Sequence, residues 1–239
     1  RYPPRFSQAT TCDEALAQLE SMTYDLVICM PGTGDNEAFD TARRIKQDYP
    51  HLPIVILTPF SHGVTERIAN EDLSAFEYVF CWLGNTDLLV SIIKLIEDKM
   101  NLEHDVSQVG VQVMLLVEDS IRFYSSVLPN LYKFVLQQSQ EFSTEALNAH
   151  QRTLRMRGRP KIVLARTYQE AWSIYEKYKN NILGVITDVR FPRTEGSPKD
   201  ALSGIKLCAA IRKEDPFVPL IIQSSESENA AYAAKYGAA

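Results

Sequence analysis

The chain contains an internal repeat, and this repeat limits the possible folds more than any other feature of the sequence. The pattern Thr-x-x-Glu-Ala occurs at Thr11–Ala15 and again, 156 residues later, at Thr167–Ala171. In each copy the threonine and the glutamate form a capping box, in which both side chains accept hydrogen bonds from amides at a helix start. The residues that follow have the apolar spacing of a short amphipathic helix. The two copies therefore predict two matching helices.

Two apolar runs follow each of these helices, separated by a further predicted helix. The runs are Tyr24–Met30 and Pro53–Thr58 in the first copy, and Ile182–Thr187 and Pro219–Ser224 in the second. They are rich in Val, Ile and Leu without strict alternation, which indicates strands that are buried on both faces. Strands that alternate with helices are typical of a parallel sheet. We therefore predict an α/β fold made of two doubly wound parallel-sheet domains.

We place the two domains at residues 1–104 and 105–239. The segment Met100–Gly110 is polar and aperiodic, so we interpret it as the linker, which follows a helix at Leu88–Glu97 that closes the first domain. Aligning the copies indicates that the first domain lacks its first strand and helix, and that the second lacks its fifth strand and helix. We expect upstream residues or a neighbouring chain to fill the gap in the first sheet. Direct pairing of that domain's second and third strands would contradict this expectation.

The composition excludes several classes of protein. With 45% hydrophobic and 23% charged residues, the chain is typical of soluble globular proteins. Its net charge of −5 argues against a protein that binds nucleic acid mainly through phosphate contacts. No apolar stretch approaches the roughly 20 residues that a membrane helix needs. The four cysteines form no CxxC motif, so we expect a reduced, cytoplasmic setting.

Oxygen-bearing side chains end three of the predicted strands in the second copy. Val111–Val117 runs into Glu118 and Asp119, Ile182–Thr187 into Asp188, and Leu220–Gln223 into Ser224. The carboxyl ends of parallel strands meet at one edge of a sheet, so these side chains are expected to converge there. Carboxylates that lie so close together remain ionised at low cost only when a cation joins them. A set of oxygen ligands suits Mg²⁺.

This pattern resembles the receiver domain of two-component response regulators. The resemblance implies a flavodoxin-like fold with strand order 2-1-3-4-5. It implies that Glu118, Asp119, Asp188 and the backbone carbonyl of Arg190 hold Mg²⁺, and that Ser224 is the switch hydroxyl. It also implies that Asp188 accepts a phosphoryl group from a histidine kinase or a phosphotransfer protein. Pro192 matches the proline that receivers have four residues after the acceptor.

The resemblance implies that the chain acts in signal transduction as a phosphoacceptor and is not an enzyme, with at most weak autophosphatase activity. Phosphorylation would switch a partner-binding surface or an output domain attached in a longer chain. A second copy of the chain is one candidate partner. We expect no membrane partner, and no nucleic-acid partner through these residues. The alternative is a tandem of receiver-like domains that only docks or dimerises, without phosphorylation.

The first copy departs from the receiver pattern and resembles a degenerate pseudo-receiver. Met30 stands at the phosphoacceptor position and cannot accept a phosphoryl group, although Thr58 keeps the switch hydroxyl. Cys81 and Trp82 stand where receivers usually have a lysine and a proline. We interpret Met30 and Cys81 as residues of the core. In the second copy, the corresponding lysine would align beyond Ala239.

Two insertions distinguish the second copy. Leu131–Leu154 predicts an extended or additional helix, and a basic run follows: Arg152, Arg155, Arg157, Arg159 and Lys161. We interpret this run as a solvated helix end, and a docking site for an acidic partner or nucleic acid is the alternative. The second insertion, Arg193–Gly204, lies beside the candidate site, and we interpret Phe191 and Pro192 at its start as packing residues.

Two enzyme-related readings fit less well. A phosphatase of the haloacid type needs a second acid two residues after the first, and Arg190 stands there. A nucleotide-binding protein of the P-loop type would need the motif GxxxxGK, which does not occur in the sequence. The four histidines have no ligand-spaced partners, so we predict no transition-metal site.

Overall fold

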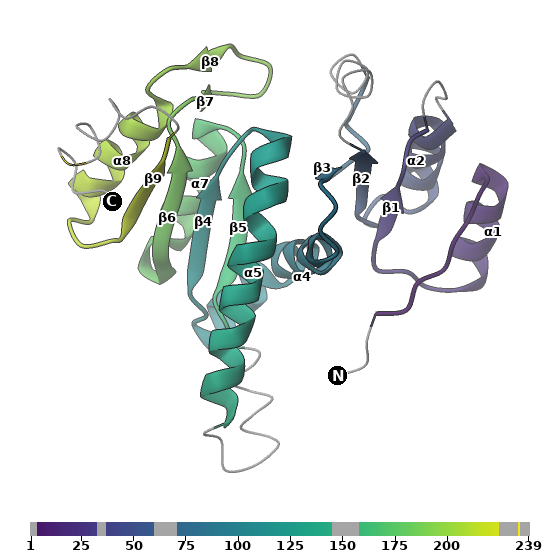
Figure 1. Ribbon diagram of the computed structural model, residues 1–239, viewed down its shortest axis with the longest axis horizontal. Coiled ribbons are helices and arrows are strands. Elements are labelled where there is room, and N and C mark those ends of the chain that lie inside the picture. Colours follow the sequence, from purple (N-terminus) through teal and green to yellow (C-terminus); the bar gives the residue numbers. More distant parts are fainter. Residues whose placement is uncertain (1–3, 33–36, 60–70, 145–157, 225–233, 235–239) are drawn as a thin grey trace. The chain divides into compact units, whose positions relative to one another are not determined.

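The computed structural model of the chain describes residues 4–32, 37–59, 71–144, 158–224 and 234. The chain divides into two compact units, Arg1–Asn85 and Thr86–Ala239, called unit 1 and unit 2 below. Figure 1 labels their helices and strands. Within the described residues, every helix is too short or too polar to span a bilayer.

Unit 1 is built around a small parallel sheet. Its elements are α1 (Cys12–Ser21), β1 (Val27–Cys29), α2 (Glu37–Asp48), β2 (Ile54–Pro59) and β3 (Tyr78–Trp82). The three strands lie in the order β1-β2-β3. Apolar residues of α1 and α2 share one hydrophobic cluster with β1 and β2, so both helices pack on the same face of the sheet.

Unit 2 has a larger parallel sheet with helices on both faces. Its main elements are α4 (Asp87–Val109), β4 (Val113–Val117), α5 (Ile121–Thr144), β5 (Lys161–Ala165), α7 (Tyr168–Tyr178), β6 (Ile182–Asp188), α8 (Ser203–Glu214) and β9 (Leu220–Gln223). Its strands lie in the order β5-β4-β6-β9. Figure 1 shows α5 in front of the sheet and α7 behind it. The predicted α/β class with parallel sheets is confirmed.

The predicted capping boxes are present at the starts of α1 and α7. The amide of Glu14 donates to Thr11 Oγ1 at 3.2 Å, and the amide of Glu170 donates to Thr167 Oγ1 at 3.1 Å. Each glutamate carboxylate accepts from the amide one residue before the cap, Thr10 at 2.7 Å and Arg166 at 2.8 Å. The two copies of the repeat therefore begin their helices with the same hydrogen bonds.

The predicted linker at 100–110 is wrong, because this segment continues α4. The helix ends at Val109, and Gly110 closes it with a left-handed backbone, φ 69°. Leu102 and Val106 pack against Val113 of β4, while Glu103 and His104 between them are exposed. Because only a narrow stripe of this part of α4 is apolar, its overall composition is as polar as that of a linker. The boundary that we placed between residues 104 and 105 falls inside α4, and the compact units divide at Asn85 instead.

The extended helix predicted after β4 is present as α5, which reaches Thr144. The rest of the predicted helix, residues 145–154, lies outside the described part of the chain. Phe191 is fully buried in the cluster that α7 and α8 form on the sheet, which confirms its role in packing.

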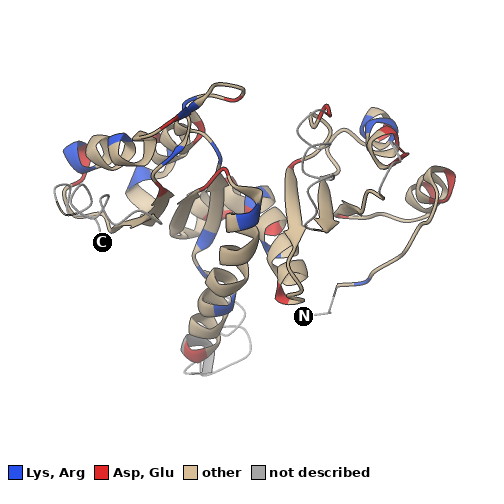
Figure 2. Ribbon diagram, turned by 45° about the horizontal axis from the view of Figure 1, so that its top comes forward, with Lys and Arg blue, Asp and Glu red and all other residues tan. Residues whose placement is uncertain are grey.

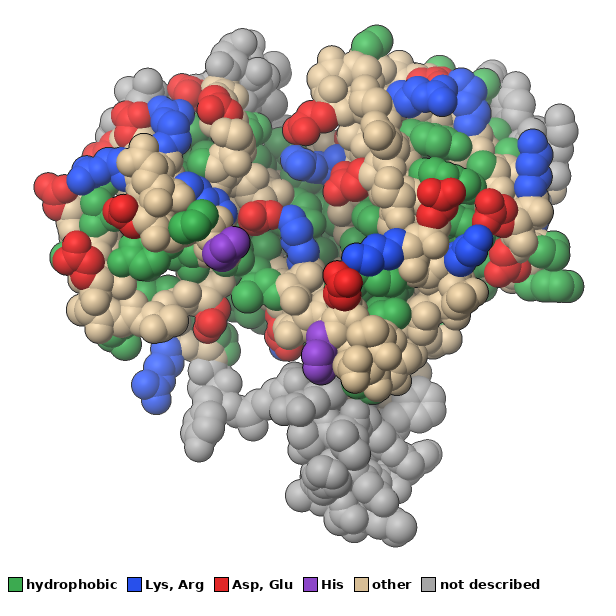
Figure 3. Space-filling view, turned by 180° about the vertical axis from the view of Figure 1, so that it is seen from behind, with side chains coloured by type: hydrophobic (Ala, Val, Ile, Leu, Met, Phe, Trp, Pro, Cys, Tyr) green, Lys and Arg blue, Asp and Glu red, His purple; other side chains and the backbone are tan. Residues whose placement is uncertain are grey.

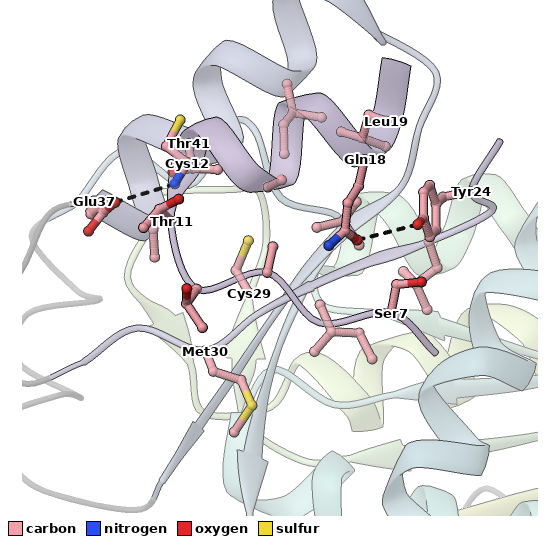
Figure 4. Close-up of a pocket in the computed structure, with 18 of the residues that line it drawn as sticks. Ser7, Thr11, Cys12, Gln18, Leu19, Tyr24, Cys29, Met30, Glu37 and Thr41 are labelled. Atoms are coloured by element: carbon pink, nitrogen blue, oxygen red, sulfur yellow. Dashed lines mark hydrogen bonds between the residues drawn. The ribbon is translucent and has the colours of Figure 1, made fainter. Parts of the chain in front are cut away.

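Unit 1 lacks a strand beside β1 among the residues that the structure describes. Residues 4–9, which correspond to β5 of unit 2, form no strand, and β1 pairs with β2. The second and third strands of this copy are therefore not directly paired. A groove of about 340 Å³ lies between the amino-terminal segment, α1 and β1 (Figure 4). Helix α1 buries no residue fully, whereas its counterpart α7 buries Ala171, Tyr175 and Tyr178.

The core interpretation is correct for Cys81 and wrong for Met30. Cys81 is buried in β3. Met30 is 68% exposed, because it follows the end of β1 and lines the groove.

Candidate functional site

The three predicted acidic residues of unit 2 lie together at one edge of the sheet. Glu118 and Asp119 follow β4, and Asp188 ends β6. Neighbouring strands β4 and β6 are in register at Val117 and Thr187, so the residues after these positions reach the same edge. One carboxylate oxygen from each acid lies within 4.8 Å of the other two. The sequence pattern therefore identified the members of this cluster.

Glu118 is the most enclosed member of the cluster. The residue is only 4% exposed, and its Oε1 accepts a hydrogen bond from the amide of Ser120 at 2.9 Å. The pKa of Glu118 is raised to about 7, chiefly by burial and also by the nearby charges of Asp188 and Asp119, against the opposing effect of that amide. The site therefore holds a carboxyl group that is protonated with unusual ease.

Asp188 is half-buried and held by its own loop. Burial raises its pKa, and the backbone amides of Val189 and Arg190 act in the opposite direction. The amide of Arg190 donates to Asp188 Oδ2 at 3.3 Å. These amides orient the carboxylate, while the loop leaves it accessible from solvent.

Asp119 carries the observation that bears most directly on metal binding. Its Oδ1 atom is buried and has no hydrogen-bond partner, although a buried carboxylate oxygen normally has one. Its Oδ2 atom lies 2.7 Å from Lys199 Nζ. An oxygen-only donor set with an unsatisfied buried oxygen fits a hard divalent cation such as Mg²⁺. The contribution of the Arg190 carbonyl to such a site stays a prediction.

Ser224 lies at the same edge of the sheet as the acidic cluster. It directly follows β9, whose Gln223 is in register with Asp188. Ser224 is exposed to solvent. In unit 1, the corresponding Thr58 is buried within β2, and its hydroxyl donates to the carbonyl of Pro59.

The insertion after Asp188 forms a hairpin that the sequence analysis treated as a lengthened loop. Strands β7 (Phe191–Pro192) and β8 (Lys199–Asp200) pair antiparallel, with Pro192 opposite Lys199. This pairing brings Lys199 to Asp119. Two-residue strands give no periodic signal, so only the basic residue in an insertion beside an acidic site could have indicated the contact.

The interpretation of the basic run as a solvated helix end is wrong for its two described residues. Arg159 and Lys161 are buried. Arg159 donates to both carboxylate oxygens of Asp98 in α4, at 2.6 and 3.0 Å, and Lys161 lies 2.6 Å from Asp105. Tyr132 of α5 also donates to Asp98, at 2.9 Å. The remaining members, Arg152, Arg155 and Arg157, lie outside the described residues.

Charges are mixed on the rest of the described surface. Lys and Arg are interspersed with Asp and Glu on α2 and α4, whereas the charged residues of α1 are all acidic (Figure 2). The face seen in Figure 3 likewise has no broad area of a single sign outside the grey atoms. The acidic cluster is therefore a local feature of unit 2.

Comparisons with known proteins give a limited result. No family model matches the chain, and no curated protein matches it. Among solved structures, the chain is similar to a response regulator receiver domain protein from Clostridium thermocellum, with 23% identity over 54% of this chain and 78% of that chain, at a TM-score of 0.34. This score is too low to establish a family.

Proposed function

We propose that unit 2 is a receiver domain of two-component signal transduction, which accepts a phosphoryl group on Asp188. The observation that carries the proposal is the convergence of Glu118, Asp119 and Asp188 within 4.8 Å, with one buried carboxylate oxygen of Asp119 left unsatisfied. The strand order β5-β4-β6-β9 supports the flavodoxin-like order 2-1-3-4 for the strands that are described.

Each residue of the site has a distinct part in the proposed transfer. Glu118 and Asp119 hold Mg²⁺ together with Asp188, and the ion, when bound, neutralises charge on the phosphoryl oxygens. An oxygen of ionised Asp188 attacks the phosphorus of a phosphohistidine. The new O–P bond forms as the P–N bond breaks, and the imidazole nitrogen keeps the electron pair of that bond. The amide of Arg190 holds the Asp188 carboxylate in place during the attack.

The phosphoryl group then changes the edge of the sheet. It adds negative charge and three acceptor oxygens beside Ser224, which is the described hydroxyl that follows the neighbouring strand. Reorientation of Ser224 changes this edge of the sheet and so a partner-binding surface or an attached output domain. The partners on this reading are a histidine kinase or a phosphotransfer protein in the cytoplasm, and unit 1 is a pseudo-receiver that docks or dimerises.

The proposal is tested by incubating the chain with acetyl phosphate and Mg²⁺ and measuring its intact mass. We expect the mass increase of one phosphoryl group, which EDTA and the substitution Asp188→Asn both abolish. Asp200→Asn is the matched control, because Asp200 is a partly exposed acid in the adjacent hairpin that pairs with Lys206. A phosphoryl group that persists in Asp188→Asn would refute the proposal. An unmodified wild-type chain would instead support the alternative, a docking module without phosphorylation.

A further inference from the structure

Lys199, in strand β8 of the hairpin, lies beside the acidic cluster and carries a positive charge. Its Nζ lies 2.7 Å from Asp119 Oδ2, and its charge also opposes the pKa increases of Glu118 and Asp188. The two partners differ sharply in environment, because the side chain of Lys199 is 58% exposed and that of Asp119 is 13% exposed. The ion pair therefore joins a solvent-exposed amine to an enclosed carboxylate.

The hairpin that carries Lys199 is fixed at its base. Phe191 is buried at the start of β7, and its carbonyl accepts from Ser203 Oγ at 2.8 Å. The carbonyl of Arg193 accepts from the amide of Gln169 at 3.0 Å, which joins the hairpin to the start of α7. Because the backbone is held in this way, the Lys199 amine can leave Asp119 by rotation of its side chain alone.

A divalent ion and the Lys199 amine require the same carboxylate. Three carboxylates within 4.8 Å repel one another, and a single ammonium group relieves only part of that repulsion. A divalent ion brings twice the charge and can use oxygens of all three acids, so it displaces the amine rather than adding to it.

We propose that Lys199 is a tethered competitor of the divalent ion: it neutralises the cluster when no ion is bound, and ion binding turns its amine out of the site. The competition lowers the affinity of the site for the ion and links ion binding to release of the hairpin's side chain. This inference rests on the proposed metal site of unit 2. It does not depend on phosphoryl transfer.

The first test is amine labelling of the full chain, read by peptide mass spectrometry with and without Mg²⁺. We expect Mg²⁺ to raise the labelling rate of Lys199 severalfold, because the amine becomes free. Lys206 is the internal reference, since it is 55% exposed and pairs with Asp200 in the same segment but outside the cluster. Its labelling rate should not change.

The second test is the Mg²⁺ dissociation constant, measured by calorimetry on variants of the full chain. Because Lys199 is largely exposed to solvent, its ion pair with Asp119 is weak, and we expect Lys199→Met to bind Mg²⁺ about two- to tenfold more tightly than the wild type. Lys199→Arg, which keeps the cation, and Lys206→Met, which removes a neighbouring one, should resemble the wild type.

The outcomes separate this inference from the proposed function. Binding of Mg²⁺ with unchanged Lys199 labelling and unchanged affinity in Lys199→Met would overturn the competition and leave the proposed function intact. Absence of Mg²⁺ binding in both the wild type and Lys199→Met would overturn the metal site itself, and the competition with it.

Discussion

Gly204, in the first turn of α8, lies against the backbone of Asp188. A Cβ atom built at position 204 would lie 1.9 Å from the carbonyl oxygen of Asp188, and the Gly204 amide donates to the carbonyl of Val189 at 3.0 Å. The candidate acceptor loop and the start of α8 are therefore packed backbone to backbone. A side chain at this position would force the loop and the helix apart.

We expect Gly204→Ala to destabilise unit 2 by about 2 kcal/mol or more, because neither backbone can yield without strain. Urea unfolding followed by circular dichroism measures the change. Gly32→Ala is the control, since a Cβ there meets no atom within 4 Å, and it should change stability by less than about 0.5 kcal/mol. Equal stability of Gly204→Ala and the wild type would show that the close approach is absent.

Asp98→Asn should be strongly destabilising. Asp98 is fully buried and accepts from Arg159, Tyr132 and the amide of Ile162. Loss of its charge leaves the buried guanidinium of Arg159 uncompensated, which costs about 3–5 kcal/mol. Thermal unfolding of the variant measures the loss. Glu103→Gln, also in α4 and paired with exposed Lys177, should cost less than about 1 kcal/mol, and similar losses in the two variants would contradict this prediction.

The pKa of Glu118 predicts how stability depends on pH in the absence of divalent ions. The carboxyl group titrates at 4.5 in an unfolded chain and at about 7 in the folded one, so between these values the folded state holds the extra proton. The free energy of unfolding therefore falls as the pH rises from about 4.5 to about 7, by roughly 2–3 kcal/mol. Denaturant titrations in EDTA measure the profile. Glu118→Gln lacks this component, and parallel profiles for the variant and the wild type would show that the group titrates normally.

Amide hydrogen exchange should detect the missing strand beside β1. The amide of Val27 donates to the carbonyl of Pro53, and the amide of Val185 donates to the carbonyl of Pro219. Successive amides of a strand point to opposite sides, so the amides of Ile28 and Ile186 point away from these partners. Ile186 faces β4, whereas Ile28 faces the groove. We expect Ile28 to exchange at least tenfold faster than Ile186 in this chain. A peptide with the β4 sequence should slow exchange at Ile28, and equal protection of the two amides without peptide would mean that the edge is already paired.

The sequence was most informative where a pattern recurs or where strands end. The two capping boxes predicted the starts of α1 and α7, and unalternating apolar runs predicted the parallel strands. The positions of Glu118 and Asp188 at strand ends placed them together, because parallel strands bring such residues to one edge.

Other features depend on contacts between distant segments and had weaker signals. The end of α4 was missed because its exposed face contributes more residues than its apolar stripe. Lys199 approaches Asp119 through a hairpin of two-residue strands, which has no periodicity. The pairing of Asp98 with Arg159 spans 61 residues, and the only sign of it was a charged residue on the apolar face of a helix.

The buried pair of Asp98 and Arg159 also limits how such a chain can diverge. A change at either position alone leaves a charge in the core, whereas an apolar residue at both positions restores neutrality. Intermediates in this exchange would be selected against. In an alignment of relatives, positions 98 and 159 should therefore covary, either both ionised or both apolar.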